Sequence, residues 1–229
     1  MHGTGTHSGY FEPVAGSLAA THRLITYDRL GWGGSEPVGD YTRTSVVEQA
    51  ITAGGLLRRM EIRGGTVVGV GFGAVVALEL ALAEPDMVAK VVMVEPPLLG
   101  LVTAATEGMS ADVAEIREAA RGGGERAAYE LFLSGELHTL GAGAGRLAAA
   151  ADRSAMAAHS FLVELPAVPA WPLDAQRLAL IEAQTVIATT PSTPPLLLEA
   201  ADGITPRIPG SSREFTVRDG AAAVQELLA

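Results

Sequence analysis

The stretch that decides the fold reads Thr66-Val-Val-Gly-Val-Gly-Phe-Gly-Ala-Val-Val-Ala-Leu-Glu-Leu-Ala-Leu-Ala83. It begins with β-branched residues, which favour an extended strand. It then passes three glycines at alternate positions (Gly69, Gly71 and Gly73) and continues in alanine and leucine, which favour a helix. The glycines and the charge of Glu79 argue against a membrane-spanning helix. The stretch therefore predicts a strand, a tight turn and a helix.

The turn has the Gly-x-x-x-Gly spacing of a nucleophile elbow, in which a reactive side chain stands on a strained turn above a sheet. The nucleophile position falls on Gly71, which has no side chain. Glycine adopts such a backbone freely, whereas a residue with a Cβ is strained there by about 1–3 kcal/mol. The pattern therefore predicts the scaffold of a hydrolase without its attacking group.

The composition suits a packed protein. The chain has 229 residues, of which 48% are hydrophobic and 18% charged, enough for one α/β domain with an inserted subdomain. A net charge of −10 argues against nucleic acid and anionic membranes as partners. Cysteine is absent, which excludes disulfides and thiolate metal sites, and we expect neither a metal nor a cofactor. The first residues lack the basic and apolar regions of a secretory signal, so we expect a cytoplasmic protein.

Strand and helix patterns alternate along the chain, which indicates an α/β fold with a mainly parallel sheet and helices on both faces. Residues 101–182 are alanine-rich and helical in pattern, so we expect an inserted helical cap between a first core part at 1–100 and a second at 183–229. We expect strands at 23–27, 66–70, 88–94, 185–189 and 213–217, and helices at 9–21, 43–62, 195–208 and 221–228.

Short motifs narrow the fold further. They are His2-Gly-Thr-Gly5, Asp28-x-x-Gly31-x-Gly33-x-Ser35, the elbow from Gly69 to Gly73, Pro85-Asp-Met-Val88 and Val94-Glu-Pro-Pro97. In this order and spacing the chain resembles the α/β hydrolase superfamily over nearly its whole length, most closely the small capped bacterial esterases. The resemblance implies an α/β-hydrolase fold. It also implies an oxyanion hole formed by the backbone N–H groups of Thr4 and Phe72, which need no side chain.

The resemblance also implies three catalytic positions, and none carries its usual residue. The nucleophile position is Gly71, the acid position is Thr193 and the base position is Ala221. No histidine follows His159, so a shifted alignment restores no base. The serine mechanism needs a nucleophile, a base and an orienting carboxylate together.

Other polar groups could line the pocket. We take His2 and Glu95 as pocket candidates. A structural role in its loop is the more ordinary role for His2. For Glu95, at the end of a strand, we expect a structural or pocket-lining role rather than a catalytic one. Asp28 is expected to hold its glycine loop through hydrogen bonds to the backbone. The histidines of the cap, His138 and His159, are expected to be surface residues.

The start of the chain departs from the family. The family has strands before the loop that contains His2, and the last of these lies between the strands predicted at 23–27 and 66–70. Three outcomes are open: the strand is encoded upstream of a shortened chain, the two neighbouring strands pair directly, or the gap stays open. We expect the first, since an open gap exposes unpaired backbone groups and apolar faces.

Three functions fit the sequence. The first is a hydrolase-fold pseudoenzyme, or a binder of a small apolar ester, acyl or carbonyl compound, without serine-hydrolase activity. The second is a non-hydrolytic enzyme, such as a lyase or cyclase, that uses the oxyanion loop. The third is a truncated, inactive remnant. The sequence leaves the ligand and the oligomeric state open.

Overall fold

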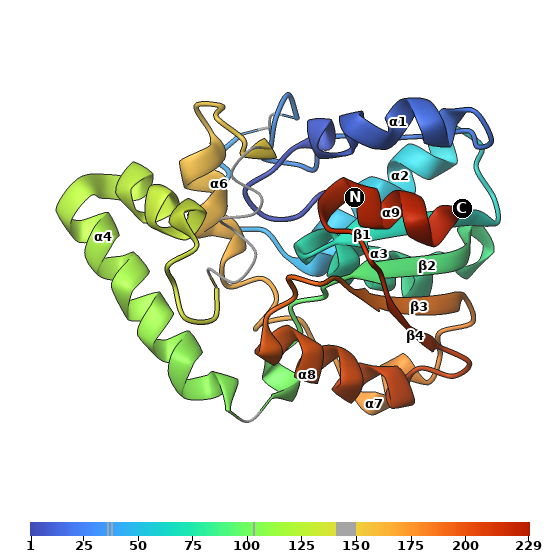
Figure 1. The fold of residues 1–229 in the computed structure, drawn as a ribbon. Helices are drawn as coiled ribbons and strands as arrows, with labels where there is room; N and C mark the ends of the chain where they lie inside the picture. The colour runs from blue at the N-terminus through green and yellow to red at the C-terminus, as the bar shows by residue number, and fades with distance from the viewer. Residues whose placement is uncertain (36, 38, 103, 141–149) are drawn as a thin grey trace.

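The fold is built on one parallel sheet of four strands (Figure 1). The computed structural model describes residues 1–35, 37, 39–102, 104–140 and 150–229. The sheet order follows the sequence: β1 (Gly65–Val70), β2 (Val88–Val94), β3 (Gln184–Thr189) and β4 (Ser212–Phe215). All three pairings are parallel, which confirms the predicted sheet.

Helices lie on both faces of the sheet and beside it. They are α1 (Glu12–Ala19), α2 (Val46–Arg59), α3 (Phe72–Ala83), α4 (Ala105–Ser134), α6 (Ala157–Glu164), α7 (Ala175–Leu178), α8 (Pro195–Ile204) and α9 (Gly220–Leu228). Because side chains alternate along a strand, Val92 and Val94 pack with α1 and α9, whereas Val91 and Met93 pack with α2, α3 and α8. Within the described residues, none of the helices has the length and apolar character that crossing a bilayer requires.

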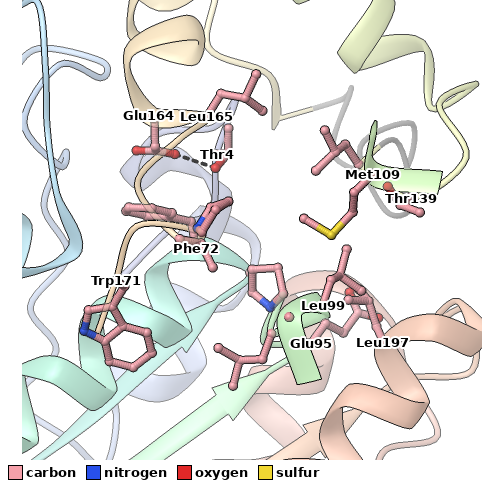
Figure 2. Close-up of a pocket in the computed structure, with 18 of the residues that line it drawn as sticks. Thr4, Phe72, Glu95, Leu99, Met109, Thr139, Glu164, Leu165, Trp171 and Leu197 are labelled. Carbon is pink, nitrogen blue, oxygen red and sulfur yellow. Dashed lines mark hydrogen bonds between the residues drawn. The ribbon is translucent and has the colours of Figure 1, made fainter. Parts of the chain in front are cut away.

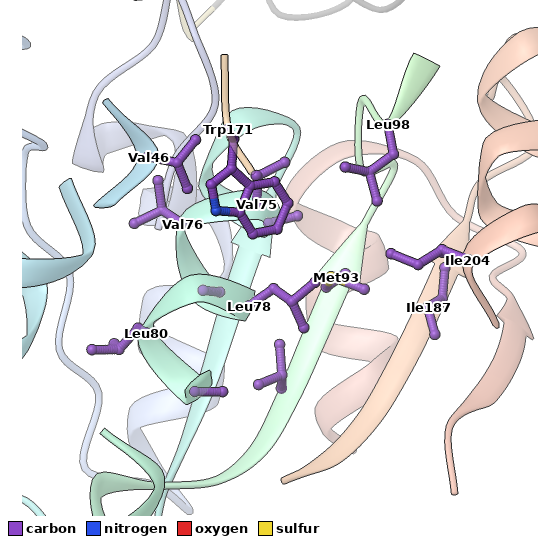
Figure 3. Close-up of a cluster of buried hydrophobic side chains, with 14 of the residues drawn as sticks. Val46, Val75, Val76, Leu78, Leu80, Met93, Leu98, Trp171, Ile187 and Ile204 are labelled. Carbon is purple, nitrogen blue, oxygen red and sulfur yellow. The ribbon is translucent and has the colours of Figure 1, made fainter. Parts of the chain in front are cut away.

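The central helix α3 lies inside the core. Its residues are apolar all round apart from Glu79, and such a helix is stable only when it is surrounded. Figure 3 shows Val75 and Leu78 of α3 among side chains of the strands and of α8. Glu79 is buried and accepts hydrogen bonds from Trp171 Nε1 at 2.8 Å and from Arg177 Nη2 at 2.8 Å, so its charge is paired.

A second group of helices lies beside the sheet, where Figure 1 shows α4 and α6. They bury their own apolar cluster, which includes Tyr129 and Phe161. Helix α4 contains one non-helical residue, Gly124 with φ of 74°, which divides it into two helical segments. Trp171 and Leu178 fall within the range predicted for the cap but pack in the main core.

The strand predicted at residues 23–27 is wrong, because the structure has no strand there. Residues 23–27 and β1 do not pair, so the gap between them is open in the structure, and a strand encoded upstream stays a prediction. Among the described residues, only Met1 bonds to the free edge of β1, donating from its amino group to Val68 O at 2.5 Å and accepting from Val70 N–H at 3.1 Å. The prediction failed because a segment with strand propensity forms a strand only when its backbone pairs with that of a neighbouring strand.

The turn between β1 and α3 requires two of its glycines. A Cβ on Gly69 would lie 2.2 Å from the carbonyl oxygen of Gly73, and a Cβ on Gly73 would lie 2.4 Å from that of Met1. Both contacts are with backbone, which cannot move aside as a flexible side chain can. The glycines therefore let the N-terminal loop lie directly against the turn.

We predict that Gly73→Ala lowers the free energy of unfolding by about 1–3 kcal/mol, the usual range for overpacking. Gly55→Ala on α2 is the matched control, because a Cβ there meets nothing within 4 Å. It should raise the stability by up to about 1 kcal/mol, since alanine favours a helix over glycine. Urea unfolding of both variants measures this. Equal effects would show that the loop does not press on the turn.

Candidate functional site

A cavity of about 450 Å³ lies at the carboxyl ends of the strands, between the sheet and the cap helices (Figure 2). Open α/β sheets bind ligands at this edge. Its wall is mostly apolar, including Leu99, Met109, Val168 and Leu197. Its size and lining suit a small apolar molecule.

Gly71 stands in the wall of this cavity, directly before α3. Its backbone has φ of 56° and ψ of −125°, the left-handed side that strains any residue with a Cβ. There is nevertheless space for a side chain: a Cβ would meet only the Cα of Gly3, at 3.8 Å. The predicted nucleophile position therefore has the backbone conformation and the space that a side chain would need, but it carries no reactive atom.

The two predicted oxyanion donors lie in the same wall. Thr4 comes from the N-terminal loop, and Phe72 is the first residue of α3. Across the described chain, neither backbone N–H has a hydrogen-bond partner in the protein. A first-turn helix N–H has no partner within its own helix, which leaves it free for a ligand. The role of both groups as an oxyanion hole remains a prediction.

A buried ion pair supports this wall. Arg29 donates from Nη1 to Glu164 Oε2 at 2.6 Å and from Nη2 to Oε1 at 3.2 Å, and both side chains are buried. Glu164 also accepts from Trp32 Nε1 at 3.0 Å and from the hydroxyl of Thr4, as Figure 2 shows for Thr4. The guanidinium lies 4.6 Å from the ring centre of Phe72. The carboxylate of Glu164, at the end of α6, thus bonds directly to Thr4 and contacts Phe72 through the guanidinium of Arg29.

Sequence reasoning did not find Arg29 or Glu164. Glu164 is the single charge in the apolar run Phe161-Leu-Val-Glu-Leu165, and a lone charge in such a run signals a buried partner. The partner could not be named, because 135 residues separate the two.

His2 lies outside the cavity wall, buried behind the loop. Its Nδ1 is 2.9 Å from Gly3 O, and its Nε2 accepts from Arg29 N–H at 2.9 Å. Burial, and then the charge of Arg29, hold the pKa of His2 well below its usual value. With both ring nitrogens engaged, this imidazole has a structural role. In the described chain, no histidine, serine or cysteine lines the cavity.

Glu95 does line the cavity, and its backbone is strained, with φ of 50°. Its Oε1 accepts from the hydroxyls of Thr190 at 2.7 Å and Thr193 at 2.6 Å. The hydroxyl of Thr193 in turn accepts from Thr190 N–H at 2.7 Å. The residue at the predicted acid position therefore orients a carboxylate that comes from the neighbouring strand.

The remaining predicted residues lie elsewhere. Ala221 is in the first turn of α9, packs toward α1 and the sheet, and does not line the cavity. Asp28 accepts from Ser8 N–H at 2.7 Å and Gly34 N–H at 2.9 Å, which confirms that it holds its loop.

His159 contacts Glu125 and the carbonyl of Tyr41. No group of three histidine or carboxylate side chains in the described ranges could hold a metal ion.

Comparison with known proteins agrees with this architecture. The sequence pattern of the alpha/beta hydrolase family matches residues 1–226. A 2-hydroxymuconate semialdehyde hydrolase of Pseudomonas putida is 38% identical over 97 residues, which are 41% of this chain. That match spans 34% of the relative's own length.

Solved structures share the fold at low sequence identity. An esterase from Exiguobacterium antarcticum has a TM-score of 0.73 and 18% identity, covering 100% of this chain and 87% of its own. The enol-lactonase from Burkholderia xenovorans has a TM-score of 0.70 and 15% identity, covering 99% and 84%. At such identities the likeness concerns the fold alone.

We predict that Arg29→Met lowers the free energy of unfolding by about 3–5 kcal/mol, because it leaves the carboxylate of Glu164 buried without a counter-charge. The double variant Arg29→Met/Glu164→Gln should recover part of this loss. Arg153→Met is the control, since Arg153 forms an exposed pair with Glu130 and should lose less than about 1 kcal/mol. Urea unfolding measures all three. Equal losses for Arg29→Met and Arg153→Met would show that the buried pair of Arg29 and Glu164 contributes no more to stability than an exposed pair.

Proposed function

The chain belongs to the alpha/beta hydrolase family, and from that premise we propose that it binds a small apolar ester, acyl or carbonyl compound without hydrolysing it by the serine route. The observation that carries the proposal is the glycine at position 71. This is the predicted nucleophile position, it lies in the wall of a cavity large enough for a small ligand, and it carries no reactive atom. Acyl transfer through serine needs an attacking hydroxyl and a base to take its proton. Among the described residues, the cavity wall has neither a serine at the predicted nucleophile position nor a histidine.

The chemistry of the cavity supports the ligand class. A carbonyl oxygen beside Gly71 would face the two backbone N–H groups of Thr4 and Phe72, while its alkyl or acyl chain would pack against Leu99, Met109 and Val168. A relative that is 38% identical over 97 residues carries the name of a semialdehyde hydrolase, whose substrate has a carbonyl group. Preformed donors bind a carbonyl whether or not a bond to it is then broken.

A second candidate, a non-hydrolytic enzyme, is favoured by one observation. Glu95 has a strained backbone, and the hydroxyls of Thr190 and Thr193 hold its carboxylate in the cavity wall. Strain of this kind persists where the surroundings impose it, often at functional sites. A carboxylate beside a carbonyl held by two N–H groups could move a proton at the carbon next to it, as lyases require.

We predict that p-nitrophenyl butyrate raises the thermal midpoint of the protein without being hydrolysed above background. Val168→Trp should abolish the shift by filling the cavity, whereas Leu180→Trp, at an exposed position, should keep it. Differential scanning fluorimetry beside absorbance at the nitrophenolate band measures both. Turnover that Val168→Trp removes would contradict a pure binder. Turnover that Glu95→Gln also removes would establish the second candidate.

We predict that a fluorophosphonate probe does not label the natural chain, and that Gly71→Ser/Ala221→His gains labelling at residue 71. A Cβ fits at residue 71, although strain there removes about 1–3 kcal/mol of stability. Gly71→Ser alone is the control, since a serine without a base reacts poorly. Intact-protein mass spectrometry measures the adduct. Labelling of the natural chain would overturn the proposal, and a folded double variant without labelling would show that the family's base position is not in reach.

A further inference from the structure

The imidazole of His159, on α6, lies between two hydrogen-bond acceptors. Its Nδ1 is 2.9 Å from Oε1 of Glu125 in α4, and its Nε2 is 2.6 Å from the carbonyl oxygen of Tyr41, in the loop before α2. A carboxylate and a carbonyl accept hydrogen bonds, whereas a neutral imidazole has only one N–H to donate. Both contacts are therefore hydrogen bonds only when the ring carries two protons and a positive charge.

The two acceptors favour the charged ring. The hydrogen bond to Glu125, and then that to the carbonyl of Tyr41, raise the pKa of His159 above its usual value of 6.5, and partial burial opposes them. Glu125 is the charged group that faces the ring from α4. The other charge of α6, Glu164, is buried and paired with Arg29. The ring therefore loses its proton at a higher pH than a free histidine does.

The other ionisable groups of these elements have different partners. On α4, Glu130 pairs with Arg126 at 3.8 Å and with Arg153 at 3.1 Å. Asp40 and Arg43 flank Tyr41 in the loop, where both are exposed, and the described contacts of the ring include neither. The charge state of the ring is thus coupled mainly to Glu125.

The contact with Glu125 lies beside the break in α4. Gly124, with φ of 74° and ψ of −175°, separates residues 105–123 from a second helical segment that begins at Glu125. Each segment supplies part of the wall of the ligand cavity, Met109 from the first and Phe132 from the second. A change of backbone angle at Gly124 would therefore move these two wall residues relative to each other.

Loss of one proton from the ring removes one of its two hydrogen bonds. The carbonyl of Tyr41 belongs to a buried residue, whereas the side chain of Glu125 is 49% exposed and can turn to water. Buried backbone acceptors are normally kept paired. The remaining N–H is therefore expected on Nε2, toward Tyr41, and the contact that opens is the one to Glu125.

We propose that His159 and Glu125 form a proton-controlled latch at the hinge of α4. The protonated ring fixes the start of the second segment to α6, and the neutral ring releases it. Release allows α4 to pivot at Gly124, which changes the width of the ligand cavity between Met109 and Phe132.

The test replaces Glu125 in the full chain. Glu125→Gln keeps the shape of the side chain, and its amide can accept from the protonated ring or donate to the neutral one, so the contact should persist in both states. Glu125→Ala removes the contact in both states. Glu130→Gln is the matched control, because Glu130 is an exposed carboxylate of the same segment with arginine partners.

The readout is hydrogen exchange of the backbone amides of residues 121–128, expressed as protection relative to a free peptide at the same pH. It is measured at about pH 5.5 and about pH 8.5, on either side of the range in which histidines titrate. His7, His22 and His138 are common to all versions, so their titration cancels when the versions are compared.

In the natural chain and in Glu130→Gln, we expect protection to fall at least about threefold from the lower pH to the higher. A raised pKa in the folded chain contributes stability below the unfolded value of 6.5, and this is lost as the pH rises through the folded pKa. Glu125→Gln should keep its protection at both pH values, and Glu125→Ala should lose it at both. Equal protection of the natural chain at both pH values, or the same pH dependence in Glu125→Gln as in the natural chain, would overturn the proposal.

The effect on the cavity rests on the proposed function and has its own readout. The rise in thermal midpoint caused by p-nitrophenyl butyrate should be at least about twofold smaller at the higher pH in the natural chain, but equal at both in Glu125→Gln. The same pH dependence in both would overturn the link between latch and cavity. If the ligand stabilises no version while exchange follows the expected pattern, the proposed function fails and the latch is supported.

Discussion

The structure depends on a contact between two backbones: the N-terminal loop lies against the turn from β1 to α3. Glycine is required on the turn, because a Cβ on Gly73 would enter the space of the carbonyl groups of Met1 and His2. This contact places Thr4 beside Phe72 in one cavity wall and brings Met1 to the edge of β1. The geometry of the site thus rests on main-chain packing, which does not depend on the side chains at the predicted catalytic positions.

The buried pair of Arg29 and Glu164 adds a second constraint to that contact. A buried ion pair is retained only with good geometry and further hydrogen bonds, and here Trp32, Thr4 and His2 supply them. Because Glu164 ends α6 and Arg29 lies in the loop before α2, the pair ties α6 to the N-terminal part of the chain. Phe161 and Glu164 of α6 also line the cavity, so the pair fixes part of its wall.

Local patterns in the sequence predicted the elements whose structure is decided locally. The alternating glycines predicted the strand, turn and helix, and valine runs predicted β2 and β3. Residues 23–27 have the composition of a strand, but a strand forms only with a neighbour, and the neighbour is absent. The same limit applied at the site: spacing placed Gly71 and Glu95, whereas the Arg29–Glu164 pair and the hydroxyl of Thr193 on Glu95 arise from contacts between distant segments.

The two strained positions of the cavity wall bear differently on function. At residue 71 glycine adopts the backbone without the strain that a residue with a Cβ would carry. At residue 95 a glutamate keeps a φ of 50°, although glycine or asparagine would adopt it more easily. Two threonine hydroxyls hold its carboxylate toward the cavity, and one of them belongs to Thr193, at the predicted acid position. Residue 71 is thus a position of positive φ filled by a residue that adopts it freely, whereas residue 95 keeps a strained backbone and a carboxylate in the cavity wall.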